Sequence, residues 1–375
     1  MKGTLPNITN ASTEGGAVRL FEMEFAWAVF GTVYMAVVLV LTVVGNSAVM
    51  VVFMTSDMLR STVNNHFLLS LAIADVLVGL LVMPCAIEAF RTQTWRCGVF
   101  MKDFNAFGNF CFCISSIMHL MLLSVDKYLS IARPLLYPTW MTTRKVYIYC
   151  LIAWIYSAFW ALLPIIGISS YECFIPYIGE CASEDWASNG LNLTFAVSVV
   201  TGTYGIALIV MFIVYVLLAR IIRDQSKRID VRIGETNPQE KKASNKSKSS
   251  VLRKYKGLMT ILLLILTYLV CWSPFCIMLF FEIAKKTKIR GPASMVGMII
   301  GFSNSCCNPI IYWLKYKRFR TAFKRIFKNH VINRLTPGGG GTFYTPSDVS
   351  VTAGSITVRR VQNAPEDSDT NTKTK

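Results

Sequence analysis

The sequence predicts an all-α membrane protein, a seven-transmembrane helix bundle with a short amphipathic eighth helix. Of its 375 residues, 53% are hydrophobic and only 16% are charged, whereas soluble domains carry about 25% charged residues. The apolar residues are concentrated in seven runs, each of about 20 residues or more, which is the length that crosses a bilayer. These runs cover residues 26–54, 65–90, 99–130, 144–168, 191–222, 254–283 and 291–314.

The distribution of basic residues predicts how these spans are oriented. With the N-terminus outside, nine of the 38 Lys and Arg residues fall in outer segments, which leaves 29 on the inner side. This excess follows the positive-inside rule. It also accounts for the net charge of +17 without nucleic-acid binding. We therefore expect a multi-pass protein of the plasma membrane with an extracellular N-terminus.

The outer side is expected to carry glycans. Residues 1–25 form a polar, extracellular N-terminal segment without a signal-peptide pattern, and they contain sequons at Asn7 and Asn10. A further sequon at Asn192 lies near the start of the fifth span and is predicted to face the same side. Three sequons on one side support the predicted orientation.

Three inner segments accompany the seven-transmembrane domain, residues 26–314. The third inner loop, about 223–253, is polar and rich in Lys, Ser and Asn, so we expect it to be flexible. In residues 315–328, Phe recurs every four positions between basic residues, which is typical of an amphipathic helix on anionic membrane lipids. Residues 329–375 contain four consecutive Gly and many Ser and Thr, which predicts a disordered cytoplasmic tail that can be phosphorylated.

Residue types that support catalysis or metal coordination by His and Cys are scarce. The chain has three His, and most of its 11 Cys lie in or beside apolar runs, without the paired spacing of a zinc site. No nucleophile–base pair appears in any span, so we do not expect an enzyme. No internal repeat stands out, which disfavours a transporter or channel.

One carboxylate lies in the middle of a predicted span, where a charge is costly and usually functional. This residue is Asp75, and the polar residues expected at a similar depth are Asn46, Ser116, Asn304 and Asn308. Carboxylate, hydroxyl and amide oxygens suit a hard monovalent cation whose shell water completes. The alternative is a protonated Asp75 within a hydrogen-bonded core.

Short motifs follow one another in span order. They are Gly45-Asn46, Leu71-Ala72-x-Ala74-Asp75, Asp126-Lys127-Tyr128, Trp154 with Pro164, Cys271-Trp272-Ser273-Pro274 and Asn308-Pro309-Ile310-Ile311-Tyr312. With these motifs the chain resembles the rhodopsin-like (class A) G-protein-coupled receptors over about residues 26–328. The resemblance implies a receptor that binds an extracellular ligand inside the bundle and activates heterotrimeric G proteins when the sixth span opens. It also implies receptor kinases and arrestin as partners of the Ser/Thr-rich tail.

The resemblance assigns two further sets of residues. A sodium ion is expected at Asp75, Ser116, Asn304 and Asn308. The residues expected to couple to the G protein and to switch the receptor are Asp126, Lys127, Tyr128, Trp272, Pro274, Asn308, Pro309 and Tyr312.

Two departures from the family pattern affect signalling. Lys127 replaces the family's arginine; lysine keeps the charge but loses the planar donor fork. Ala207 replaces the proline of the fifth span. The neighbours Asp126 and Lys127 form either a local ion pair or a charge latch that opens when a partner docks. A receptor-like protein with constitutive or absent G-protein coupling is therefore the alternative function.

The motif pattern is nearest to that of biogenic-amine receptors, which implies a ligand pocket between spans three, five, six and seven. Its expected wall is Asn109, Cys113, Thr203, Trp272, Phe275, Cys276, Leu279 and Met298. Asn109 stands where amine receptors place an aspartate, and an amide cannot neutralise an ammonium group. We therefore expect an amine-like or neutral small molecule. The basic residues 285–290 of the third outer loop leave an acidic ligand or peptide as the alternative.

The outer disulfide is expected to be unusual. Family receptors carry a Cys at the position of Lys102, whereas here Cys97 lies two residues after Trp95. We expect Cys97 to pair with Cys181 of the second outer loop, with Cys173 as the alternative partner. In a third arrangement, Cys173 pairs with Cys181 and Cys97 is free.

Overall fold

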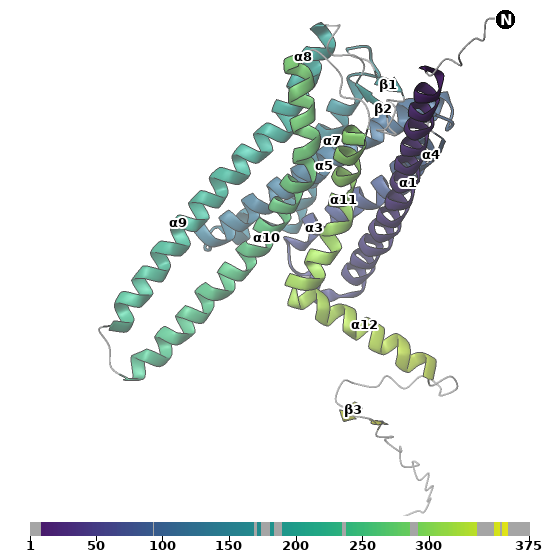
Figure 1. Cartoon of the computed structure of the whole chain (residues 1–375). Helices are drawn as coiled ribbons and strands as arrows, with labels where there is room; N and C mark the ends of the chain where they lie inside the picture. The colour runs from purple at the N-terminus through teal and green to yellow at the C-terminus, as the bar shows by residue number, and fades with distance from the viewer. Residues whose placement is uncertain are drawn as a thin grey trace, which may run out of the picture. The chain divides into compact units, whose positions relative to one another are not determined.

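Seven helical spans build the first of the two compact units, Met1–Lys324 and Arg325–Lys375, in the computed structural model (Figure 1). The spans are α1 (Thr9–Thr55); α3 (Asn65–Leu77), η1 (Val78–Val82) and α4 (Met83–Thr92); α5 (Val99–Ala132); α7 (Thr143–Leu162); α8 (Gly190–Val199), η2 (Val200–Gly205) and α9 (Ile206–Gly234); α10 (Pro238–Lys285); and α11 (Pro292–Lys315). The structure describes residues 9–92, 94–168, 171–173, 181–183, 190–234, 238–285, 292–335, 349–352 and 355–358. The short helices α2 (Asp57–Arg60) and α6 (Tyr137–Trp140) follow α1 and α5.

The membrane-spanning character of the helices is visible in their composition and their exposed faces. Among the described residues, six helices are long and apolar enough to cross a membrane. The helix α11 is not one of them, since Ser and Asn residues interrupt its apolar run. Large hydrophobic side chains such as Phe212, Val270 and Ile277 are about two-thirds exposed, as expected for a surface that lipid covers.

Two spans continue further on the inner side than predicted. The helix α9 ends at Gly234 and α10 begins at Pro238, and the two pack against each other (Figure 1). The prediction of a flexible loop over 223–253 is therefore wrong for most of its length. Lys, Arg, Gln and Glu in this segment have high helix propensity, and the apolar spans already supply the nucleus from which each helix extends.

Two π-helical segments, η1 and η2, interrupt the second and fifth spans. The Nδ2 atom of Asn105 donates a hydrogen bond to the carbonyl oxygen of Val82, the last residue of η1, over 3.0 Å. The hydroxyl of Tyr156 donates to the carbonyl oxygen of Gly202 within η2 over 2.7 Å. A Cβ atom at Gly202 would lie 2.8 Å from the Trp160 ring, so the absence of a side chain lets η2 approach α7.

Close contacts also fix α11 against α1. A Cβ atom at Gly45 would lie 3.0 Å from Cγ of Pro309, so glycine permits this approach. The hydroxyl groups of Tyr34 and Ser303 are 2.8 Å apart. The Nδ2 atom of Asn46 donates to the carbonyl oxygen of Ser305 over 3.0 Å. These contacts hold the half of α11 that contains the Asn-Pro motif.

Two small hairpins lie outside the spans. Strands β1 (Tyr171–Cys173) and β2 (Cys181–Ser183) are antiparallel, with Cys173 directly opposite Cys181. In the second unit, β3 (Val349–Thr352) and β4 (Ser355–Val358) are antiparallel, with Val349 opposite Val358. The latter hairpin lies inside the segment predicted to be disordered, where alternating Val, Ser, Ile and Thr residues favour strands.

The amphipathic helix after α11 is longer than predicted. It is α12, Lys317–Leu335, which ends seven residues beyond the predicted boundary at residue 328. The four-residue repeat of Phe319 and Phe323 continues through Val331 to Leu335, so the apolar face of the helix also continues. The Pro-Gly sequence that begins at Pro337 then ends the pattern.

Candidate functional site

A cavity of about 140 Å³ lies between α5, the fifth span, α10 and α11. All eight residues predicted for the ligand pocket line it. Sequence reasoning missed the other lining residues, which are Phe110, Ile114, Ile117, Phe195, Ala196, Val199, Val200, Tyr204 and Tyr268. On α5 the helical period from Asn109 could have identified Ile117. On the fifth span the helical period from Thr203 could likewise have identified Val199 and Ala196, whereas Tyr204 lies inside η2, where the helical phase changes.

The polar groups of this cavity are few and uncharged. Among the described residues that line it, none is Asp, Glu, Lys, Arg or His. Asn109 is buried, and its Oδ1 atom accepts a hydrogen bond from Sγ of Cys113 over 3.4 Å. The hydroxyl of Thr203 donates to the carbonyl oxygen of Val199 in its own helix over 2.6 Å. The wall thus offers amide and hydroxyl groups to a ligand but no counter-ion.

A row of aromatic rings forms one side of the cavity. The ring centroids are 6.0 Å apart for Tyr204 and Tyr268, 6.1 Å for Tyr268 and Trp272, and 6.0 Å for Trp272 and Phe275. Trp272 and Phe275 meet nearly edge to face, at 84°, an arrangement that aromatic pairs prefer. Pro274 lies between them inside α10, where a proline weakens the helix and allows it to bend.

The four predicted cation-binding residues, Asp75, Ser116, Asn304 and Asn308, are all buried in the helix bundle. Nδ2 of Asn308 donates a hydrogen bond to Oδ2 of Asp75 over 2.8 Å. Four buried oxygens have no hydrogen-bond partner: Oδ1 of Asp75, Oγ of Ser116, Oδ1 of Asn304 and Oδ1 of Asn308. Buried polar atoms are rarely left unpaired. These are also the oxygen types that bind hard cations, so the donor set fits a sodium ion.

At the inner end of α5, Asp126 has a partner that the sequence did not predict. The hydroxyl of Tyr137, on α6, donates to Oδ1 of Asp126 over 2.7 Å. Burial and the adjacent carboxylate raise the pKa of the Tyr137 hydroxyl above its usual range, so this group keeps its proton. The ion pairs between described side chains join Arg60 to Asp57 and Arg91 to Glu88, and none involves Lys127.

Two further predicted switch residues are Tyr128 and Tyr312, and Tyr128 packs against the buried cluster that contains Ile131 and Leu218. The side chain of Tyr312 is almost fully buried, with its hydroxyl unpaired and its ring 5.9 Å from that of Tyr316. Arg318 is an electrostatic neighbour of Lys127 and donates to the hydroxyl of Thr62 over 3.2 Å. Lys127 therefore has both the Asp126 carboxylate and the Arg318 guanidinium as electrostatic neighbours, without an ion pair to Asp126 among the described side chains.

A family model described as "7 transmembrane receptor (rhodopsin family)" matches residues 45–312. The chain is a rhodopsin-family seven-transmembrane receptor. It is 30% identical to the D(1)-like dopamine receptor of Takifugu rubripes over 355 residues, covering 88% of this chain and 76% of that protein. It is 28% identical to the histamine H2 receptor of Canis lupus familiaris over 302 residues, 79% of each chain.

Further similarities agree with this assignment. The receptor is 29% identical to trace amine-associated receptor 5 of Mus musculus over 314 residues, covering 80% of this chain and 86% of that protein. Squid rhodopsin has the same fold, with a TM-score of 0.70 at 19% identity over 83% of this chain and 87% of that one. The predictions of family, fold class and absence of enzymatic activity are therefore confirmed.

The predicted outer disulfide of this receptor is not formed in the structure. Cys97 is a free thiol. The expected pairing of Cys97 with Cys181 is therefore corrected. In the first outer loop the indole Nε1 of Trp95 donates to the carbonyl oxygen of Gly98 over 3.0 Å and the Trp95 ring packs on Ala106 of α5, so Cys97 lies in a turn that these contacts fix. The side chains of Cys173 and Cys181 lie outside the described residues, as do those of Asn7, Asn10 and Asn192.

Proposed function

We propose that this receptor binds a small, neutral, largely apolar extracellular ligand in the cavity and activates heterotrimeric G proteins. The observation that carries the proposal is the uncharged, buried wall around Asn109. A ligand ammonium placed there would lose its hydration without gaining a counter-ion, which is strongly unfavourable. The relatives are named for dopamine, histamine and trace amines, and this receptor departs from an amine pocket at that position.

The aromatic row supports a route from the cavity to the inner side. Trp272 lines the cavity and lies two residues from Pro274 in α10. A ligand that contacts Trp272 would push on the segment of α10 beside Pro274, where the free-energy cost of bending the helix is lowest. We propose that α10 swings at Pro274 and opens the inner side to the G protein, with Asp126, Lys127, Tyr128, Pro309 and Tyr312 as the coupling residues.

The oxygen cluster supports a second, allosteric ligand. Asp75, Ser116, Asn304 and Asn308 would hold a sodium ion, which supplies a positive charge beside the buried carboxylate. Asp75 comes from the second span, Ser116 from α5, and both Asn residues from α11. Oxygen ligands from three spans would tie these helices together in the resting arrangement. Ligand binding and sodium binding would then oppose each other.

We propose that the receptor lies in the plasma membrane with its N-terminus outside. The excess of Lys and Arg on the opposite side supports this orientation. Receptor kinases and arrestin would act on the Ser/Thr-rich tail. An acidic ligand receives no support from the described wall of the cavity, which contains no basic side chain.

Basal second-messenger output tests the proposed coupling. The native receptor would be expressed beside empty cells, Asp75→Asn and Lys127→Arg, with equal surface levels confirmed. Output of cyclic AMP or calcium that changes with these substitutions establishes G-protein coupling and identifies the pathway. A silent native receptor together with a signalling Lys127→Arg variant would instead favour the alternative, a receptor whose lysine has disabled coupling.

A further inference from the structure

The π-helical segment η2 determines which side chains of the fifth span line the cavity. The lining residues of this span are Phe195, Ala196, Val199, Val200, Thr203 and Tyr204. Each residue of an α-helix advances about 100° around the axis, so in an unbroken helix these six side chains would cover about half of the circumference. A π-helical turn contains more residues, and each of them advances less. The segment η2, Val200–Gly205, therefore turns Tyr204 back towards the cavity.

A proline adjoins one of the two π-helical segments but not the other. The segment η1 is followed by Pro84 in α4, and a proline cannot donate the backbone hydrogen bond of a regular helix. The fifth span, residues 190–234, contains no proline, and Ala207 stands where the family has one. Gly202 and Gly205 weaken the helix here, but they do not specify a π-helical turn. Another contact must then favour this turn.

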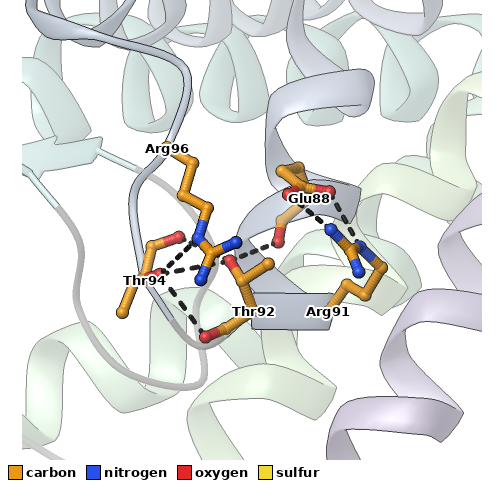
Figure 2. Close-up of polar contacts among 5 residues, drawn as sticks. All are labelled: Glu88, Arg91, Thr92, Thr94 and Arg96. Atoms are coloured by element: carbon orange, nitrogen blue, oxygen red, sulfur yellow. Dashed lines mark hydrogen bonds and ion pairs between the residues drawn. The ribbon is translucent and has the colours of Figure 1, made fainter.

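The second span also has local contacts at its outer end (Figure 2). Nε and Nη2 of Arg91 donate to the two carboxylate oxygens of Glu88 over 2.9 and 2.8 Å. The hydroxyl of Thr92 lies 2.8 Å from the carbonyl oxygen of Glu88 and 2.9 Å from that of Thr94. The second span is therefore shaped partly by its own proline and by contacts within residues 88–94.

The segment η2 is instead held from α7. The hydroxyl of Tyr156 donates to the carbonyl oxygen of Gly202 over 2.7 Å. A π-helical turn interrupts the hydrogen-bond ladder of the α-helix, and a carbonyl group there is satisfied by another donor. The ring of Trp160, one turn further along α7, is 6.2 Å from that of Tyr156 and would lie 2.8 Å from a Cβ atom at Gly202. The hydrogen bond and the close approach thus meet at one residue of η2.

We propose that Tyr156 is a positioning residue that holds the π-helical turn of η2 and thereby sets which side chains of the fifth span line the ligand cavity. Tyr156 is not among the lining residues, so it acts through Gly202. Without the Tyr156 hydroxyl, the regular ladder satisfies the carbonyl group of Gly202 best, and η2 relaxes towards an α-helix. Tyr204 then turns away from the cavity, while Thr203 stays near the middle of the lining face. The inference rests on the proposed ligand cavity and assigns part of its specificity to a residue outside it.

Thiol labelling of the full-length receptor tests this role. Tyr204→Cys is prepared with and without Tyr156→Phe, and each purified receptor is treated with methyl methanethiosulfonate, which is small and neutral. Peptide mass spectrometry follows the rate of modification at each site. The rate at Tyr204→Cys should fall by about tenfold with Tyr156→Phe, as expected for loss of a buried hydrogen bond. The rate at Thr203→Cys should not change, and Cys113 and Cys276 of the cavity wall are internal references.

Two further variants separate the hydrogen bond from other effects of the substitution. Ala207→Pro should restore the labelling of Tyr204→Cys in the Tyr156→Phe receptor, because a proline interrupts the regular ladder one turn earlier in the helix. Tyr147→Phe is the matched control, since it removes an exposed hydroxyl from the same helix α7. This control should leave the labelling of Tyr204→Cys unchanged.

Equal labelling of Tyr204→Cys with and without Tyr156→Phe would overturn the proposal. Gly202→Ala keeps the Tyr156 hydroxyl but pushes its acceptor away from the Trp160 ring, so it should lower labelling in the same way. A loss of labelling with Gly202→Ala but not with Tyr156→Phe would also overturn the proposal, because close packing alone would then hold η2.

Unfolding of the Tyr156→Phe receptor would be revealed by faster labelling of Cys113 and Cys276. In that case, recovery of the native rates with Ala207→Pro supports the proposal, and a lack of recovery contradicts it. The labelling needs neither ligand nor G protein. Its failure therefore contradicts the role of Tyr156 alone, whereas a receptor that is silent in the signalling assay contradicts the proposed coupling alone.

Discussion

The cavity and the oxygen cluster around Asp75 lie in one helix bundle but treat buried polar atoms in opposite ways. In the cavity, Asn109 accepts from Cys113 and Thr203 donates to its own backbone, so polar groups are partly satisfied and none is charged. Among the predicted cation-binding residues, four buried oxygens, one each from Asp75, Ser116, Asn304 and Asn308, lack partners. The difference indicates that the receptor separates two tasks. The described wall of the cavity carries no charged side chain, whereas the unpaired oxygens of Asp75, Ser116, Asn304 and Asn308 fit the proposed sodium ion.

The largest effect is expected from placing a charge in the cavity. Asn109→Asp supplies the missing counter-ion, so the response to dopamine or histamine should rise by about 100-fold, the equivalent of about 2.7 kcal/mol. Concentration–response curves in cells measure this change. Asn105→Asp, one turn away and outside the cavity lining, is the matched control. An Asn109→Asp receptor that stays as insensitive to dopamine and histamine as the native one would contradict the idea that the cavity lacks only a counter-ion.

The next effect concerns the cation cluster. Replacing N-methylglucamine with sodium should stabilise the native receptor by about 1.4 kcal/mol when the ion is present at ten times its Kd. Ser116→Ala and Asp75→Asn should reduce this gain. Ser124→Ala serves as the control, because its hydroxyl donates to the carbonyl oxygen of Leu120 outside the cluster. Thermal unfolding in the two salts provides the measurement. Equal stability of the native receptor in both would exclude the ion.

A smaller effect is expected at the inner end of the bundle. Tyr137→Phe removes the hydrogen bond to Asp126. Loss of a bond to a charged or buried acceptor costs about 1–2 kcal/mol, so the resting state should weaken and basal signalling should rise by about fivefold. A G-protein dissociation sensor reports this change. Tyr147→Phe, with an exposed side chain, should have no effect. Unchanged basal output in Tyr137→Phe would show that Asp126 is held by other contacts.

The smallest effect is expected from Thr203→Val within the cavity. The hydroxyl already bonds to Val199 in the same helix, so its loss should change the free energy of unfolding by less than about 0.5 kcal/mol. Thermal unfolding of the purified variant tests this value. Val200→Thr is the matched variant, because it adds a hydroxyl to the cavity lining instead of removing one. A large loss of stability in Thr203→Val would mean that this hydroxyl holds the wall together.

Much of this receptor could be predicted from residue order alone. Long apolar runs can satisfy backbone hydrogen bonds inside a bilayer only as helices, which determines the spans. The resemblance to the rhodopsin-like receptors implied the eight pocket residues, all of which line the cavity; the sodium ion at Asp75, Ser116, Asn304 and Asn308 stays a prediction.

Other features depended on contacts between segments distant in sequence or on local breaks in helical period. The segments η1 and η2 change the helical phase, so Tyr204 enters the cavity without a pattern to indicate it. The hydroxyl of Tyr137 meets Asp126 because α6 returns beneath α5. The sequence alone determined which helices cross the membrane, because this follows from the length of each apolar run. It also determined which face each helix presents, because this follows from the helical period. Only the tertiary structure decided these partners, since each depends on how separate segments pack.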